Sequence, residues 1–281
     1  MSSSVNYFAS NRGRTRTISF TSGKGGVGKS SLVANLALSL SRSGHRVLLL
    51  DGDLGMANLD IMFDINVTKN LNQVLFGDFS MSDILVPIAP NLDLILIPGG
   101  SGIYELQGLP LSLKQSLMDK VSQLPKSYDY MFIDTAPGID DNVLYLNSAA
   151  SEIIVVVTPD PSSITDAYAL IKVLNSRCRE NRFSILCNMV KDEREGLQVF
   201  RRLSEVADRF LCVSLDYRGL VPMDSVLSKA TKMQQLVLNF DPRCGASLAI
   251  QSISKKMSSF EHLNELKGGI QFFWQQVAGV A

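Results

Sequence analysis

A glycine-rich segment near the start of the chain carries the residue types that bind phosphates. It reads TSGKGGVGKSS over Thr21–Ser31 and fits the pattern G-x-x-x-x-G-K-[S/T], whose fixed positions are Gly23, Gly28, Lys29 and Ser30. In this pattern backbone N–H groups converge on phosphate oxygens, the lysine reaches the outer phosphates and the serine hydroxyl ligates Mg²⁺ directly. The segment predicts a nucleotide site. The pattern does not account for a second lysine, Lys24, inside the loop.

Two carboxylates follow the next apolar run of the chain. The segment DGDLGMANLD covers Asp51–Asp60, and Asp51 and Asp53 point the same way if the strand continues, because strand side chains alternate. Transfer of a phosphoryl group to water needs a group that orients the water and neighbours that organise the metal. Asp53 suits the first task, and Asp51 suits the second, through a metal-bound water. The alternative is an acidic turn without a ligand.

A third carboxylate ends another apolar run. In IDTAPG, Ile133–Gly138, Asp134 is placed to hold a water of the Mg²⁺ shell, which is the usual second half of a nucleotide site. Pro137 and Gly138 then suit a loop that moves when the outer phosphate leaves. An aspartate at a strand end can also simply cap a helix.

The elements that must position these residues alternate along the chain. Apolar strand patterns occupy Thr17–Thr21, Arg46–Asp51, Leu92–Pro98, Tyr128–Thr135, Glu152–Thr158, Phe183–Val190 and Phe210–Leu215. Helical patterns occupy Ser30–Ser43, Leu111–Leu124, Ser163–Arg177 and Glu195–Arg209. This alternation predicts an α/β fold with a doubly wound, mostly parallel sheet and helices on both faces. Such sheets bind ligands outside the carboxyl ends of their strands, where the three motifs fall.

Composition is compatible with one large domain. The chain has 281 residues, of which 46% are hydrophobic and 19% charged, with a formal net charge of zero. We predict a flexible N-terminal tail over residues 1–16, a nucleotide-binding domain over residues 17–266 and an amphipathic tail over residues 267–281. Its four cysteines form no C-x-x-C pair, and no apolar run reaches the roughly 20 residues of a membrane span.

The C-terminal tail has two possible binding surfaces. One helical face of residues 270–281 carries Ile270, Phe273, Trp274, Val277 and Ala281. The segment is too short to persist alone in water, so it must fold against a membrane interface or an apolar groove of its own domain. Tryptophan and phenylalanine favour the interface, whereas the lack of Lys and Arg argues against strong attraction to anionic lipid.

The phosphate loop is similar to that of a known family. GKGGVGKS resembles the deviant loop of the MinD/ParA ATPases, P-loop NTPases of the SIMIBI class, whose distinguishing feature is a lysine at the position of Lys24. DGDLGMANLD, DTAPGIDDNV and TPDPSSITDAYALIK (Thr158–Lys172) resemble the FlhG (FleN) group of flagellar-number regulators. The resemblance covers roughly Arg16–Met257. It implies that Lys24 reaches the partner's nucleotide across a dimer interface, which would make ATP binding and dimerisation one event.

The resemblance also implies a residue set. Lys24, Lys29 and Asp53 would be catalytic, with Asp53 positioning the attacking water. Phosphate contacts would come from Gly23, Gly25, Gly26, Val27, Gly28, Lys29, Ser30 and Ser31. Ser30 would bind Mg²⁺ directly, and Asp51 and Asp134 would bind it through water. Asn188 would contact adenine, joined by Pro222 and Asp224 of VPMDSVLSKA, although a proline and an aspartate at a helix start need no ligand.

The function implied is an ATP-dependent dimerising switch with slow ATP hydrolysis that regulates flagellar number or placement, with ATP/ADP and Mg²⁺ as cofactors. Expected partners are a second copy when ATP is bound, a flagellar regulator or partner GTPase, and a reversible membrane contact through residues 270–281. The expected location is cytoplasmic, on the inner face of the membrane or at a pole. Residues 1–16 lack the D-Q-A-x-x-L-R segment with which FlhG proteins activate their GTPase.

Other functions of the same superfamily remain alternatives. One is a MinD-like division-site regulator, and another is a ParA-like ATPase that positions DNA or cargo. Nucleic acid is not an expected partner, because Glu205 and Asp208 interrupt the cluster of Arg201, Arg202 and Arg209. A metal-cluster carrier would need paired cysteines and a bacterial tyrosine kinase module a terminal tyrosine cluster, and the sequence shows neither.

Overall fold

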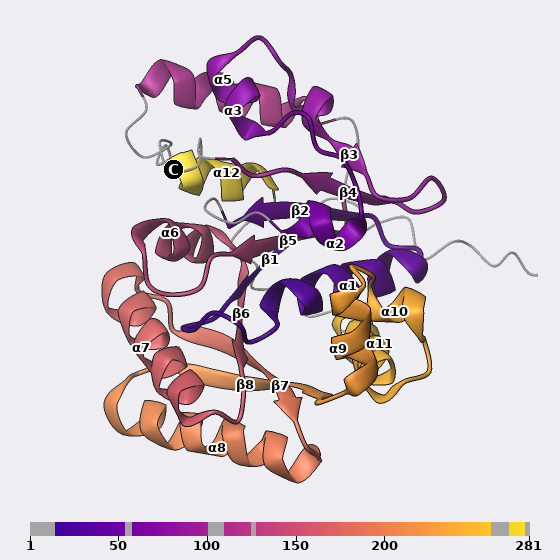
Figure 1. Ribbon diagram of the computed structural model, residues 1–281. Coiled ribbons are helices and arrows are strands. Elements are labelled where there is room, and N and C mark those ends of the chain that lie inside the picture. Colours follow the sequence, from indigo (N-terminus) through magenta and orange to yellow (C-terminus); the bar gives the residue numbers. More distant parts are fainter. Residues whose placement is uncertain (1–14, 54–57, 101–109, 125–127, 260–269, 279–281) are drawn as a thin grey trace, which may run out of the picture.

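The computed structural model describes residues 15–53, 58–100, 110–124, 128–259 and 270–278. Within them, eight strands form one sheet in the order β3-β4-β2-β5-β1-β6-β7-β8, shown in Figure 1. The strands are β1 (Arg16–Thr21), β2 (Val47–Gly52), β3 (Val86–Pro87), β4 (Leu94–Ile97), β5 (Tyr130–Thr135), β6 (Glu152–Val157), β7 (Arg182–Val190) and β8 (Ser214–Pro222). Every pair is parallel except β3 with β4. The predicted doubly wound α/β fold is confirmed.

The helices lie on both faces of this sheet. They are α1 (Lys29–Arg42), α2 (Leu59–Phe63), α3 (Leu71–Phe76), the 3₁₀ turn η1 (Met81–Ile84), α5 (Leu111–Ser122), α6 (Asp141–Ala149), α7 (Pro161–Cys178), α8 (Glu193–Phe210), α9 (Ser225–Lys232), α10 (Val237–Phe240), α11 (Gly245–Ser259) and α12 (Ile270–Ala278). Figure 1 shows α1, α9, α10 and α11 grouped together, away from α6, α7 and α8. The sequence patterns predicted α1, α5, α7, α8 and the tail helix, but not α6, α11 or the short helices.

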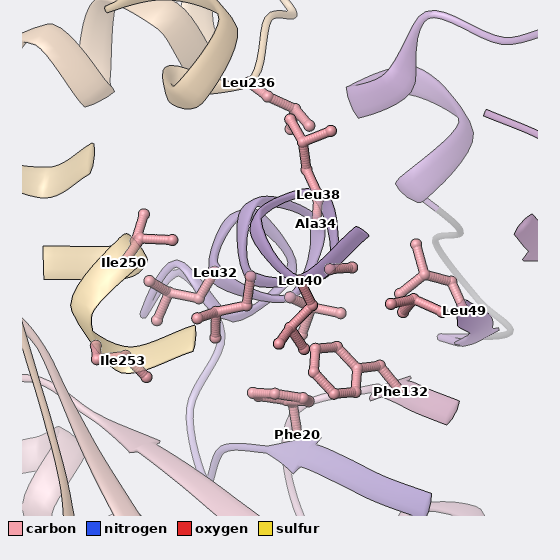
Figure 2. Packing of buried hydrophobic residues seen from close by; sticks show 14 of the residues in the cluster. Phe20, Leu32, Ala34, Leu38, Leu40, Leu49, Phe132, Leu236, Ile250 and Ile253 are labelled. Carbon is pink, nitrogen blue, oxygen red and sulfur yellow. The ribbon is translucent and has the colours of Figure 1, made fainter. Parts of the chain in front are cut away.

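Strand alternation divides the core between the two faces. Phe20 of β1 and Phe132 of β5 pack under α1, whereas Ile133 faces the opposite side with α3, α5 and α12. Figure 2 shows the two phenylalanine rings under α1, with Ile250 and Ile253 of α11 beside it. The helix that follows the phosphate loop is therefore buried on several sides, which fixes the loop at the edge of the sheet.

The predicted strand Phe210–Leu215 is wrong. Helix α8 continues to Phe210, and β8 begins only at Ser214. The apolar residues around Phe210 belong to the end of α8, where Phe210 is 64% exposed. The strand that follows, β8, is irregular and lies at the edge of the sheet. The register of β8 with β7 shifts twice, and Gly219 within β8 has φ 138°. The sequence of β8 also contains no continuous apolar run.

The tail helix α12 packs on its own domain in this structure. Phe273 and Trp274 are fully buried and Val277 is 2% exposed, in a cluster with Met131 and Ile133 of β5. The helix contacts α5 and α6. Of the two surfaces left open by the sequence, the groove on the domain is the one occupied here. Among the helices of the described residues, none is both long and apolar enough to cross a membrane.

Candidate nucleotide-binding site

The carboxyl ends of the strands from β2 to β7, which follow the sheet order β2-β5-β1-β6-β7, bring the predicted residues together. The loop after β1 lies beside β5, where Phe20 pairs with Asp134, and β2 places Asp51 opposite Asp134 on the other side. Asn188 stands near the end of β7, two strands away from β1. Parallel strands place all their carboxyl ends at one edge, so residues more than 100 positions apart form one site.

The glycines of the loop are required by its conformation and by its neighbours. Gly26 and Gly28 have φ values of 79° and 81°, in the left-handed region that favours glycine. A Cβ atom on Gly23 would lie 2.2 Å from the backbone carbonyl of Asp166 in α7. The loop then passes directly into α1, whose first residue is Lys29. Free N–H groups at that helix start are suited to bind an anion.

A buried ion pair occupies the centre of the site. Lys29 Nζ donates to Oδ1 of Asp134, and the two side chains are only 6% and 2% exposed. Each charge compensates the other, because an unpaired charge at this depth would be strongly destabilising. Lys29 therefore lies within reach of both the Asp134 carboxylate and the interior of the phosphate loop. Phosphate oxygens at that loop would offer this lysine a second partner.

Asp51 organises the segment that follows β2. Its carboxylate oxygens accept hydrogen bonds of 3.2 Å from the backbone N–H groups of Asp53, Asn58 and Leu59. Burial, together with the nearby Asp134 carboxylate, raises the pKa of Asp51 to about 7. Asp53 is less buried and lines a cavity with Ser30 and Ser31. Residues 54–57, within the predicted DGDLGMANLD segment, lie outside the described residues.

The second lysine of the loop is held by its own chain. Lys24 Nζ donates to Oδ2 of Asp160 at 2.7 Å and to Oγ of Ser162 at 2.5 Å. Asp160 also accepts from the Ser162 N–H at 3.0 Å as the N-cap of α7. The hydrogen bond from Lys24 is the main reason why the pKa of Asp160 lies below its ordinary value. The pair lies at the surface, with side-chain exposures of 41% and 48%.

Two cavities adjoin the loop and share Lys24, Gly25, Gly26 and Val27. The first, of about 490 Å³, contains the inner loop residues Lys29, Ser30 and Ser31 together with Asp53 and Pro137. The second, of about 690 Å³, extends toward the ends of β6, β7 and β8 and is lined by Asp160, Met189 and Met223. Together the two cavities have the size expected for a nucleotide, and both contact the phosphate loop.

Asn188 carries an unused acceptor beside the loop. Its Nδ2 donates to the Val27 carbonyl at 2.8 Å, and because a carbonyl only accepts, this bond fixes the orientation of the amide. Its Oδ1 is buried and accepts no hydrogen bond from the residues that the structure describes. A buried acceptor without a donor costs free energy, and an exocyclic amino group of a base would satisfy it. The residues present therefore fit a nucleotide whose base offers such a donor.

Pro222 is the last residue of β8 and Asp224 follows it, and the aspartate has a clear structural task. Its two oxygens accept from the N–H groups of Val226 at 2.8 Å and Ala246 at 2.9 Å, which joins the starts of α9 and α11. Burial alone would raise the pKa of Asp224, but these backbone hydrogen bonds lower it below its ordinary value. The helix-start interpretation of Asp224 thus has direct support, and a contact with a base stays a prediction.

Four side chains at the site were not selected from the sequence. Asp160 and Ser162 hold Lys24, and Met189 and Met223 line the larger cavity. The run Asp-Pro-Ser-Ser from Asp160 to Ser163 is a typical helix start, so the cap was predictable, whereas its pairing with Lys24 was not. No local pattern marks the two methionines.

Comparisons with known proteins agree with this geometry. Residues 15–185 match the family model described as AAA domain. Antiactivator FleN of Pseudomonas aeruginosa is 38% identical over 262 residues, which are 93% of this chain and 93% of that protein. Flagellum site-determining protein YlxH of Helicobacter pylori is 35% identical, over 96% of this chain and 92% of its own length. In the solved MinC:MinD cell division protein complex of Aquifex aeolicus, a chain at 26% identity superposes with a TM-score of 0.68, covering 87% of this chain and 96% of that one.

The family model covers residues 15–185, and the two flagellar relatives align with more than nine tenths of this chain. The chain belongs to the MinD/ParA family of deviant Walker A ATPases, in the group that includes FleN (FlhG) and YlxH.

Proposed function

We propose that this protein is an ATP-dependent dimerising switch that regulates flagellar number or placement. The observation that carries the proposal is the loop with both Lys24 and Lys29 at the sheet edge that also holds Asp51 and Asp134. The flagellar role rests on the likeness to FleN and YlxH over more than nine tenths of the chain. ATP hydrolysis in such a switch is slow and acts as a timer.

The chain's own residues divide the work of binding and hydrolysis. The glycine loop and Lys29 would hold the phosphates. Ser30 would ligate Mg²⁺, Asp51 and Asp134 would hold it through water, and the ion would neutralise charge at the outer phosphates. When a nucleotide binds, Lys29 would leave Asp134 for the phosphates. The Asp134 carboxylate would then be available to hold Mg²⁺ through water. Asp53 orients a water, whose oxygen forms a bond to the γ-phosphorus while the bond to the ADP oxygen breaks and the water proton passes to solvent.

Dimerisation changes the partner of Lys24. In the single chain Lys24 is held by Asp160 and Ser162, and Asp160 lies in the wall of the larger cavity. In the proposed dimer two copies face each other across their nucleotides, and Lys24 leaves Asp160 for the partner's phosphates. Because the contact is symmetric, each copy completes the other's site. ADP, which lacks the outer phosphate, favours the monomer.

The tail helix gives the switch a membrane readout. Helix α12 packs against α6, which begins directly after the loop that follows Asp134. A change in that loop on ATP binding is therefore transmitted to a neighbour of α12. We propose that dimerisation releases α12, and that two weakly binding tails on one dimer together hold the protein at the membrane. The partner in flagellar assembly is a regulator or GTPase whose identity the proposal leaves open.

A MinD-like role at the division site is the second candidate, favoured by the MinD relatives of similar fold. A deletion strain separates the two. The flagellar proposal expects altered numbers or positions of flagella in normally dividing cells. Displaced septa with unchanged flagella would support the division-site role and contradict the flagellar one.

The biochemical part is tested with purified protein. Calorimetry with Mg²⁺-ATP and Mg²⁺-GTP should show preference for ATP, and Lys29→Ala should remove binding. Light scattering of Asp53→Ala with ATP should give a dimer, because this variant binds ATP without hydrolysing it. A monomer at concentrations well above those of the cell would exclude the dimerising switch.

A further inference from the structure

Met189 adopts a backbone conformation that a methionine rarely takes. Its φ is 57°, in the left-handed region where a side chain crowds the following carbonyl. The other non-glycine residues with positive φ in the described part of the chain are Asp64, Arg179 and Gln234, at helix ends or turns where this conformation is common. Of these four residues, only Met189 interrupts a strand. It lines a cavity beside the phosphate loop, and strained backbone conformations often occur at functional sites.

The conformation belongs to a bulge that changes which face the side chains occupy. Asn188 pairs with Val221 and Val190 pairs with Pro222, so Met189 is an extra residue in β7. Before the bulge, Ile185 and Cys187 lie in the core under α7 and α8, and after it Val190 takes that position. Because of the bulge, Met189 does not occupy the core face under α7 and α8, where regular alternation would place it.

As a result, two consecutive side chains lie against the phosphate loop. A Cβ atom built on Gly28 would be 2.5 Å from Nδ2 of Asn188 and 3.3 Å from Cε of Met189. Met189 lines the cavity of about 690 Å³ that begins at the loop. The same bulge fixes Met223, whose N–H donates to the Val190 carbonyl at 2.7 Å and whose side chain is 71% exposed on the cavity wall.

We infer that Met189 packs on the flat face of the purine base whose edge meets the Asn188 amide. This inference rests on the proposed binding of an adenine nucleotide. A thioether side chain is polarizable and makes favourable contacts with aromatic rings, but it offers no strong donor or acceptor. Met189 therefore supplies contact area to any purine, while the Oδ1 of Asn188 accepts from the 6-amino group of adenine, where guanine carries a carbonyl oxygen.

The test compares a nucleotide with a ligand that has no base. Calorimetry is performed with Mg²⁺-ATP, Mg²⁺-GTP and Mg²⁺-tripolyphosphate on the full chain and on Met189→Gly. Glycine suits a φ of 57°, so the variant keeps the loop and relieves the strain, and its melting temperature should equal or exceed that of the parent. We expect ATP and GTP affinities to fall by the same factor, about tenfold, and tripolyphosphate affinity to change less than about twofold.

Two further variants separate base contact from backbone effects. Met189→Leu restores apolar area at the same φ and should recover most of the lost ATP affinity. Arg179→Gly relieves the same kind of strain at the end of α7, at an exposed residue that lines neither loop cavity, and should raise stability without changing ATP affinity.

The outcomes are distinguishable. ATP binding by Met189→Gly at the parent's affinity, or an equal loss of tripolyphosphate affinity, would overturn the inference and leave the proposed function intact. If the parent chain binds tripolyphosphate but prefers neither ATP nor GTP over it, the adenine-nucleotide function fails, and the role of Met189 fails with it.

Discussion

Lys24 Nζ lies 2.7 Å from Oδ2 of Asp160 in the single chain. The lysine that distinguishes this phosphate loop from an ordinary one is therefore already engaged, on the side chain that caps α7. Any role for Lys24 at another subunit's nucleotide requires that this pair be broken. The pair is exposed, so breaking it costs little, and the proposed exchange of partners is energetically accessible.

Replacement of Asp160 by Asn should favour the dimer. Asparagine still caps α7 but no longer holds Lys24 by charge, so we expect ATP to produce dimer at a lower protein concentration, by less than about tenfold. Light scattering across a dilution series in the Asp53→Ala background measures this shift. Lys24→Ala in that background should lose the dimer, and an unchanged midpoint in Asp160→Asn would show that the pair does not restrain the lysine.

Removal of Lys29 should lower stability as well as nucleotide affinity. Lys29→Ala leaves the buried Asp134 carboxylate without its partner, and we expect a loss of about 3 kcal/mol in the free energy of unfolding. Asp134→Asn in the Lys29→Ala background should recover part of that loss, because it removes the unpaired charge. Urea unfolding of Lys29→Ala, Asp134→Asn and the double variant gives the coupling free energy between the two side chains. Strictly additive effects would contradict a direct buried pair.

Asp51 should make stability depend on pH. Its folded pKa of about 7 lies above its ordinary value of 3.8, so between these values the folded chain holds a proton that the unfolded chain has released. Stability from this group is therefore full below about pH 4 and declines as the pH rises to 7, by at most about 1.4 kcal/mol per pH unit. Urea unfolding from pH 5 to 8 should show this slope, reduced in Asp51→Asn and kept in Asp64→Asn, which alters an exposed carboxylate.

Gly28 should tolerate no side chain, whereas Gly25 should. A Cβ at Gly28 would meet Nδ2 of Asn188 at 2.5 Å in a left-handed conformation, but at Gly25 the nearest atom is Cγ of Pro137 at 3.7 Å. We expect Gly28→Ala to lower the melting temperature and to lose ATP binding, because both the loop and Asn188 must shift. Gly25→Ala should melt close to the parent. Equal melting of the two variants by differential scanning fluorimetry would refute this steric explanation.

The single tryptophan of the chain reports on α12. Trp274 is fully buried, so its fluorescence should be blue-shifted in the monomer. Its Nε1 has no hydrogen-bond partner among the described residues, which weakens the docked state. If dimerisation releases α12, ATP added to Asp53→Ala should shift the emission to the red, and liposomes should reverse the shift. Lys24→Ala should show neither change.

Sedimentation with liposomes tests the same release independently. Pelleting should require ATP and vanish when the chain is cut after Gly268. If the full and truncated chains pellet equally, with and without ATP, membrane contact through α12 is excluded and only the domain-packed helix remains.

Much of the fold and of the phosphate site could be predicted from the sequence, because the signals are local. The loop connects a strand directly to a helix, so the spacing of its glycines and Lys29 identifies it from the sequence alone. Asp51 and Asp134 each end an apolar strand, and a parallel sheet places such ends side by side. The family resemblance of these segments agrees with the relatives found over most of the chain.

Only the tertiary structure determined the contacts between residues that lie far apart in the sequence. Lys24 meets Asp160 across 136 positions, Asp224 joins the starts of α9 and α11, and the bulge at Met189 sets which side chains face the loop. The amphipathic tail was compatible with a membrane or a groove, and its burial between α5 and α6 depends on a surface built by other elements. Local patterns record a residue's preference for a strand, a turn or an apolar surface. The packing of the whole chain determines which partner each residue meets, because the position of every element depends on the positions of the others.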